Sequence, residues 1–103
     1  MDRIIKIKEM LQTTPKDSFL RHALALEYIK IGKNAIAKEV FEQLLTDDPD
    51  YVGSYYHLAK LLEAMNDKDA AIHWYEKGMA IAKQRNERHA YNELQSAYEE
   101  LIY

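Results

Sequence analysis

The sequence predicts an all-α fold, an α-solenoid of about six helices arranged as antiparallel pairs. Two observations lead to this prediction. An apolar pattern recurs along the chain at a constant spacing, and only three glycines and two prolines occur in 103 residues. Strand-rich folds need many tight turns, and tight turns favour glycine and proline. The low number of both residues therefore favours helices.

The repeat is visible in the segments that follow the two prolines, Pro15 and Pro49. The first segment contains Arg21-x-x-Leu24-Ala25-x-x-Tyr28 and then Ala37-x-x-x-Phe41. The second contains Tyr55-x-x-Leu58-Ala59-x-x-Leu62 and then Ala71-x-x-x-Tyr75. Each run places apolar side chains on one face of a helix. The alanines, which recur at the same offsets, are predicted to lie where paired helices approach closely.

Periodicity and turn residues together predict six helices. They are expected over residues 2–12, 17–31, 34–46, 51–65, 68–84 and 88–102. Gly32 and Asn66 lie between the helices of each pair and are predicted to adopt the left-handed conformation that ends a helix. Ser18 is predicted to cap the second helix through its hydroxyl group.

The repeat resembles the tetratricopeptide repeat, a helix–turn–helix unit of about 34 residues with the pattern W-x₂-L-G-x₂-Y, A-x₃-F and P. The separation of Pro15 from Pro49 equals the length of one such unit. In the second copy Tyr55, Ala59, Ala71 and Tyr75 fit the pattern, whereas Lys83 replaces the closing proline. The resemblance implies a single domain over residues 1–103. Its segments are an N-terminal half unit (1–15), a first repeat (16–49), a second repeat (50–83) and a C-terminal capping helix (84–103).

Composition argues against several classes of partner. The net charge is −3, and the basic residues are spread along the chain rather than gathered in one half. A strong attraction to nucleic acid or to an anionic membrane surface therefore has no source. The chain has no cysteine and no uninterrupted apolar stretch of the length that a signal peptide or a spanning helix needs. We expect a cytoplasmic protein.

Residue patterns typical of catalysis, metal binding or cofactor binding do not occur. No histidine lies four residues from another, the spacing that a helical zinc site favours. The serines have no nucleophile-elbow motif around them, and the glycines are too isolated to form a phosphate-binding loop. We therefore predict that the chain is not an enzyme and uses no cofactor or metal.

The family resemblance implies a concave groove, lined by the first helix of each unit, that receives a peptide or a helix of another protein. The predicted groove residues lie one step off the core stripe. They are Phe19, His22, Leu26, Ile29 and Lys30 in the first repeat, Gly53, Tyr56, Lys60 and Glu63 in the second, and His89, Asn92 and Ser96 on the last helix. Leu26 and Ile29 could instead be covered by neighbouring helices.

A basic clamp for a C-terminal carboxylate, which some tetratricopeptide domains carry, is not expected here. The corresponding positions hold His22, Leu26, His57 and His89, and the nearby Glu93 would repel a carboxylate.

These patterns predict a protein–protein interaction module or scaffold. The alternative is a structural unit that forms homodimers through apolar end faces. Those faces would consist of Ile4, Ile5 and Ile7 at one end and Leu101, Ile102 and Tyr103 at the other.

Overall fold

The computed structural model describes residues 2–103 as helices joined by short turns, grouped into two compact units. The first unit ends at Asp48 and the second runs from Pro49 to Tyr103. Across residues 2–103 there are six helices and no strand, which confirms the predicted all-α repeat fold. The assignment of the chain to one domain with four segments stays a prediction.

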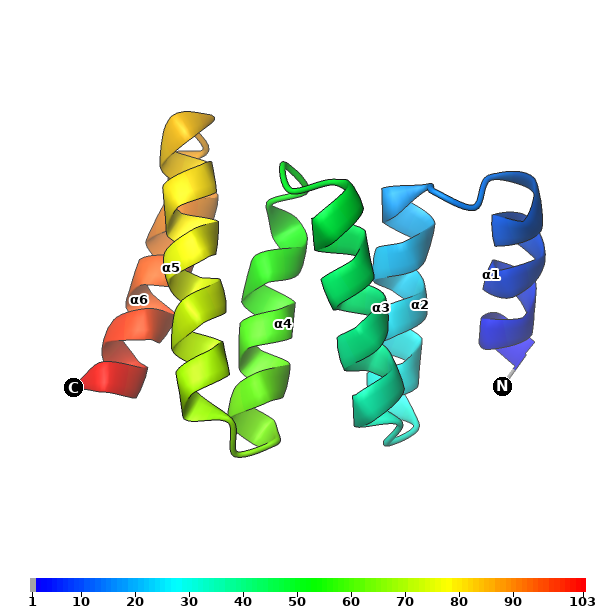
Figure 1. Cartoon of the computed structure of the whole chain (residues 1–103), viewed down its shortest axis with the longest axis horizontal. Helices are drawn as coiled ribbons and strands as arrows, with labels where there is room; N and C mark the ends of the chain where they lie inside the picture. The colour runs from blue at the N-terminus through cyan, green and yellow to red at the C-terminus, as the bar shows by residue number, and fades with distance from the viewer. Residues whose placement is uncertain (1) are drawn as a thin grey trace. The chain divides into compact units, whose positions relative to one another are not determined.

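The first unit consists of α1 (Asp2–Thr13), α2 (Ser18–Lys30) and α3 (Asn34–Asp47). Helix α2 packs against both α1 and α3, and successive helices run in opposite directions (Figure 1). The spacing of Ile4 and Ile7 places both side chains on the side of α1 that is buried, whereas Ile5 is 52% exposed. Two of the three isoleucines predicted for an apolar end face are therefore part of the core.

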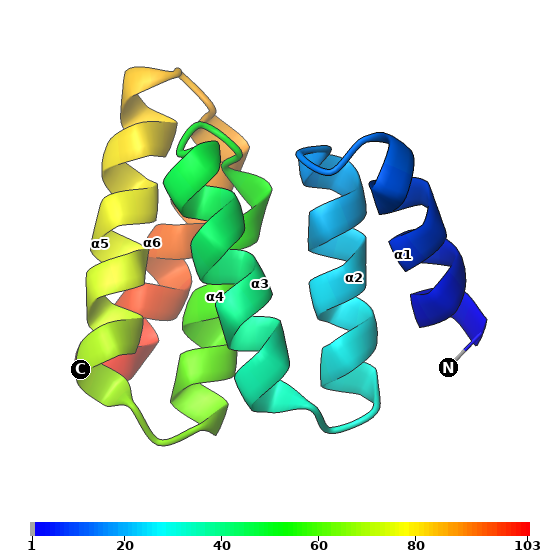
Figure 2. The same cartoon turned by 45° about the vertical axis from the view of Figure 1, so that its right-hand side comes forward.

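The second unit consists of α4 (Gly53–Ala64), α5 (Lys68–Gln84) and α6 (Arg88–Ile102). All three helices contact one another, and Figure 2 shows α6 beside both α4 and α5. Helix α4 begins two residues later than predicted. The backbone before it forms a tighter turn, in which the amides of Ser54 and Tyr55 donate to the carbonyls of Tyr51 and Val52.

The four recurring alanines lie at the helix contacts, as predicted. Ala25, Ala37, Ala59 and Ala71 are each 0% exposed. The bulky residues of the repeat, Phe41 and Tyr75, are also fully buried. Each unit thus buries both small and large side chains of the repeat, which lets the backbones approach while the space between them is filled.

Three helices end in the same left-handed turn. Gly32, Asn66 and Asn86 have φ angles of 78°, 62° and 57°. In each case the next residue donates its amide to a carbonyl five residues back, as in Lys33 to Tyr28 at 2.9 Å. This is the Schellman arrangement, which satisfies carbonyls that a helix end would leave unpaired. The roles predicted for Gly32 and Asn66 are confirmed, and Asn86 repeats them at the end of α5.

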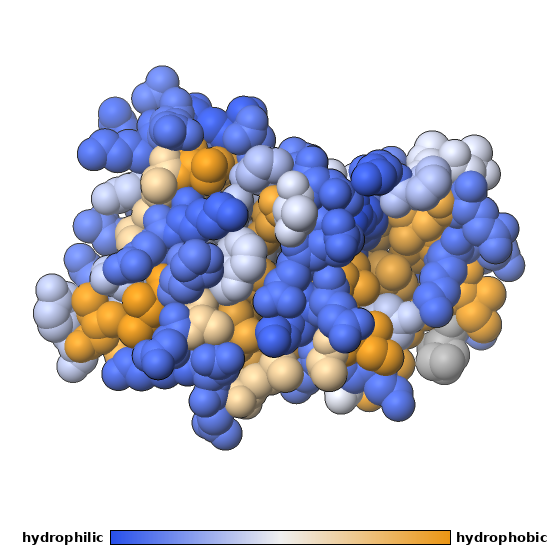
Figure 3. Space-filling view, viewed as in Figure 1, coloured by the Kyte–Doolittle hydropathy of each residue, from blue (hydrophilic) through white to orange (hydrophobic). Residues whose placement is uncertain are grey.

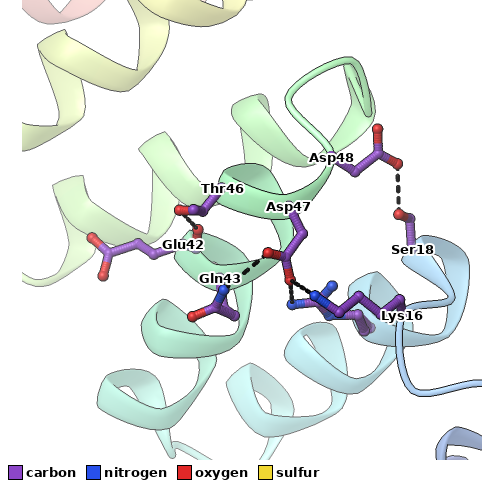
Figure 4. A network of polar contacts seen from close by, with 8 residues as sticks. Lys16, Ser18, Glu42, Gln43, Thr46, Asp47 and Asp48 are labelled. Atoms are coloured by element: carbon purple, nitrogen blue, oxygen red, sulfur yellow. Dashed lines mark hydrogen bonds and ion pairs between the residues drawn. The ribbon is translucent and has the colours of Figure 1, made fainter.

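The start of α2 differs from the prediction. Asp17, not Ser18, caps the helix, because its carboxylate accepts a hydrogen bond of 2.9 Å from the amide of Leu20. The Ser18 hydroxyl instead donates to the carboxylate of Asp48 at 2.6 Å (Figure 4). The two candidate caps are adjacent in the sequence, and a carboxylate at the cap position accepts an amide proton as readily as a hydroxyl does.

Arg21, which stands where the second repeat has Tyr55, is buried to 8% exposure. Its guanidinium Nη2 lies 3.0 Å from the Asp47 carboxylate at the end of α3. Gln43 and Lys16 also contact this carboxylate, as Figure 4 shows. Hydrogen bonds from Arg21 and then Gln43 hold the pKa of Asp47 below its usual value. In the first unit, therefore, a buried arginine paired with Asp47 occupies the position that holds an aromatic residue in the second unit.

Gly78 on α5 lies where the helices of the second unit approach closely. A Cβ atom at this position would lie 2.6 Å from the Cβ of Tyr55 and 3.1 Å from Cδ1 of Leu94. Both neighbours are fully buried, so neither can move aside freely. A side chain at Gly78 would therefore press on both α4, through Tyr55, and α6, through Leu94.

We expect Gly78→Ala to lower the free energy of unfolding by about 1–3 kcal/mol, because the added methyl group overpacks a closed contact. The natural control is Gly53→Ala, since a Cβ at Gly53 meets nothing within 4 Å. Urea unfolding followed by circular dichroism measures both. Equal stability of the two variants would show that α5 does not approach its neighbours this closely.

Candidate functional site

The predicted binding residues divide between the two units, and each group is described on its own helices. Five of them lie on α2. Phe19 is 70% exposed at the start of the helix, and Leu26 and Ile29 are half-buried. The half-buried His22 packs edge-on against Phe41, with ring centres 5.5 Å apart. Its ring is thus held in place by the core.

Lys30, at the end of α2, is paired within its own unit. Its ammonium lies 3.2 Å from the Glu27 carboxylate, which Arg3 of α1 approaches to 3.4 Å on the same oxygen. Phe19 at one end of α2 and Lys30 at the other are thus the solvent-exposed members of the α2 group.

In the second unit, α4 and α6 form a pocket of about 220 Å³. Tyr56 and Lys60 line it from α4. The residues that line it from α6 are Glu93, Ser96, Ala97 and Glu100. The structure therefore brings three of the predicted residues, Tyr56, Lys60 and Ser96, together with further residues of α6. We call this surface the α4–α6 pocket.

Lys60 and Tyr56 contact each other at the α4 side of the pocket. The Lys60 ammonium lies 5.9 Å from the centre of the Tyr56 ring, within the range of a cation–π contact. The same ammonium is 3.8 Å from the Glu63 carboxylate, the long end of an ion pair. Neither contact fixes Lys60 firmly, and its side chain is 41% exposed.

Glu63 is held from the core side by Tyr75, which is fully buried on α5. The Tyr75 hydroxyl donates a short hydrogen bond to the Glu63 carboxylate. Burial, and after it this hydrogen bond, raises the pKa of Tyr75 well above its usual value. The carboxylate of Glu63, a predicted binding residue, is thus held by a hydrogen bond from the core.

His89 and Asn92 do not line the α4–α6 pocket. Both are exposed on α6, and the His89 ring lies 3.4 Å from the Glu93 carboxylate. On α4, burial lowers the pKa of His57, and the nearby Glu93 partly opposes this effect. The carboxylate of Glu93 therefore interacts with a histidine on each of the two helices that form the pocket, His89 on α6 and His57 on α4.

Sequence reasoning did not single out Ala97 and Glu100 as binding residues. The signal was present, because Glu93, Ala97 and Glu100 lie at intervals of four and three residues, which places them on one stripe of a helix. The period of the repeats does not extend to α6, so it assigns neither Ala97 nor Glu100 to the binding surface.

A second pocket, of about 300 Å³, lies at the turn between α5 and α6. Its lining mixes both charges through Lys83, Glu87 and Arg88 and includes none of the predicted binding residues. Unlike the α4–α6 pocket, it therefore offers no support for the predicted binding surface.

The part of the chain that the structure describes contains no group of three histidine, aspartate, glutamate or cysteine side chains that could hold a metal ion. Over the same residues, no helix has the length and apolar character needed to cross a membrane.

The fold and this repeated pattern define a known family. A family profile described as "Tetratricopeptide repeat" matches residues 28–98. The chain belongs to the tetratricopeptide repeat family. Domains of this family generally mediate protein–protein interactions and are typically non-catalytic.

Solved structures agree with this assignment. A tetratricopeptide repeat domain protein from Salinibacter ruber is 41% identical, with a TM-score of 0.82 over 85% of this chain and 89% of that one. The TPR2B domain of yeast Sti1, solved as a complex with pHsp70, is 17% identical and has a TM-score of 0.87 over 95% of this chain and 78% of that one. The second similarity is one of fold alone.

Among curated proteins, the human aspartyl/asparaginyl beta-hydroxylase is 28% identical over 76 residues. The match spans 74% of this chain but only a tenth of the length of that relative. The activity that its name describes belongs to the whole relative, and the match carries no reaction over to this chain.

We expect Tyr75→Phe to lower the free energy of unfolding at neutral pH by about 1–2 kcal/mol, because Glu63 loses a hydrogen bond from a buried donor. The pH dependence should change as well. Above about pH 10 the unfolded chain releases its tyrosine protons, whereas folded Tyr75 keeps its proton. The unfolded state then binds fewer protons, so stability falls as pH rises.

Thermal melts at about pH 9, 10 and 11 measure this loss of stability, which should be smaller in Tyr75→Phe than in the wild type. Tyr103→Phe is the matched control, because Tyr103 is 96% exposed. Parallel curves for the wild type and Tyr75→Phe would contradict a raised pKa of Tyr75.

Proposed function

We propose that the chain is an interaction module that binds a peptide or a helix of a partner protein. One observation carries this proposal: the α4–α6 pocket combines an aromatic side chain, a small floor residue and charged rim residues on two packed helices. Aromatic residues in such pockets often dominate binding energy, because they provide a large contact area at a low cost in conformational entropy.

Within this proposal Tyr56 and Glu63 contact the partner from α4, and Lys60 borders the same contact. His89 and Asn92 extend the contact along the exposed side of α6. On α2, the exposed Phe19 is a further anchor, accompanied by His22, Leu26, Ile29 and Lys30. Leu26 and Ile29 are half-buried, so they add less contact area than Phe19.

Self-association is a second candidate, and exposed apolar residues favour it. Ile5 and Met10 on α1 are 52% and 48% exposed. At the other end of the chain Leu101 and Ile102 are half-buried. Figure 3 shows this apolar surface along α1 and near the end of α6. Sedimentation velocity at micromolar concentration separates the candidates, because a monomer would remove the second.

The test of the binding proposal is quantitative capture from a lysate of the native host, with the wild type and Tyr56→Ala compared by mass spectrometry. We expect at least one prey protein to fall about tenfold or more with Tyr56→Ala, the size of effect that truncation of an aromatic anchor produces. Tyr103→Ala, a truncation of an exposed tyrosine outside the pocket, should leave that prey unchanged.

Circular dichroism is used first, to establish that Tyr56→Ala and Tyr103→Ala are both folded. A set of prey proteins that is the same for the wild type and for Tyr56→Ala would contradict a partner contact at the α4–α6 pocket.

A further inference from the structure

The charges around the α4–α6 pocket are unequal. Glu93 and Glu100 reach it from α6, and Lys60 from α4 is the only positive residue of its lining. Glu93 and Glu100 are both exposed, and the His89 ring that lies 3.4 Å from the Glu93 carboxylate is exposed as well, so a partner can reach both carboxylates. A carboxylate that approached this pocket would meet two like charges, whereas an ammonium or guanidinium group would meet two opposite ones.

The pocket also shows how a cation is accommodated. The Lys60 ammonium lies 5.9 Å from the centre of the Tyr56 ring and 3.8 Å from Glu63, and so is near both an aromatic face and a carboxylate. Both contacts are at the long end of their range, and the Lys60 side chain is 41% exposed. An incoming cation can therefore replace it at the ring without breaking a strong contact.

We propose that the α4–α6 pocket receives a lysine or arginine side chain, so that the partner segment is basic. The inference rests on the proposed binding function and specifies its partner. Glu93 and Glu100 pair with the incoming cation and the Tyr56 ring stacks against it. Ala97, which carries only a methyl group, leaves room for its aliphatic stem. Lys60 competes with the partner for the same place.

The experiment is a selection of random peptides of about twelve residues, displayed on phage, against the immobilised chain. Enriched peptides are synthesised and their dissociation constants are measured by fluorescence anisotropy. We expect the peptides whose binding Tyr56→Ala weakens to share one lysine or arginine position. Replacing that residue by glutamine should weaken binding to the wild type.

The variant Glu93→Gln/Glu100→Gln should weaken the same peptides about fourfold to twentyfold, the product of two exposed charge contacts. The control Glu9→Gln/Glu99→Gln removes the same net charge at exposed positions outside the pocket lining and should change binding less than about twofold. The peptide with glutamine at the shared position should bind the pocket variant and the wild type with the same affinity, because the charge contact is then absent from both complexes, as a double-mutant cycle requires.

Lys60→Met provides a result of opposite sign. It should tighten the basic peptides about twofold to fivefold, because it removes a competing cation and a repulsive charge. If Lys60 only supported the structure of the pocket, Lys60→Met would weaken binding instead.

The two proposals can fail separately. Enriched peptides that depend on Tyr56 but are acidic or uncharged would overturn the basic-partner inference and leave the binding function standing. A selection that yields no peptide dependent on Tyr56 would overturn both.

Discussion

The packing between helices depends on their close approach at residues with little or no side chain. In the first unit Ala25 and Ala37 lie at 0% exposure, and in the second Ala59 and Ala71 do the same. Gly78 takes this constraint to its limit, because even a methyl group there would meet Tyr55 and Leu94. The position of α6 beside α4, and with it the α4–α6 pocket, follows from this packing. The site is therefore a consequence of steric fit between helices, not of a loop placed on the surface.

Polar contacts refine a packing that apolar contacts establish. At the end of α3 the Asp47 carboxylate pairs with the guanidinium of Arg21, and at the end of α4 the Glu63 carboxylate accepts a hydrogen bond from the Tyr75 hydroxyl. In both cases a buried donor reaches an acceptor near a helix terminus, where water can still solvate the carboxylate. A buried donor without a partner would cost more than these hydrogen bonds contribute, so the pairing mainly restricts which neighbours fit. The hydrogen bond from Tyr75 to Glu63 also connects the core to the proposed binding surface.

Much of the fold could be predicted from the sequence, because the repeat is local and periodic. The spacing of alanine and aromatic residues indicates the helix pairs, and Gly32 and Asn66 mark the turns between the helices of each pair.

Three features could not be predicted in this way. The acceptor of Arg21 is Asp47, which lies on another helix, and no pattern in α2 indicates it. Gly78 resembles any isolated glycine until Tyr55 and Leu94 are placed around it. The stripe of α6 that lines the pocket lies outside the period of the repeats, so their register does not reach Glu93 and Glu100. The residues predicted on α2 were assigned from the family resemblance, and their role in binding stays a proposal.

The most direct measurement of the central claim is the free energy of unfolding of Ala71→Leu beside that of Ala80→Leu. Both changes enlarge an alanine of α5 by the same amount, but Ala71 is fully buried and Ala80 is exposed. Overpacking at the helix contact should cost Ala71→Leu about 1–3 kcal/mol, whereas Ala80→Leu should match the wild type within about 0.5 kcal/mol. Equal stability of the two variants in urea unfolding would show that the paired helices are not held together at their small residues.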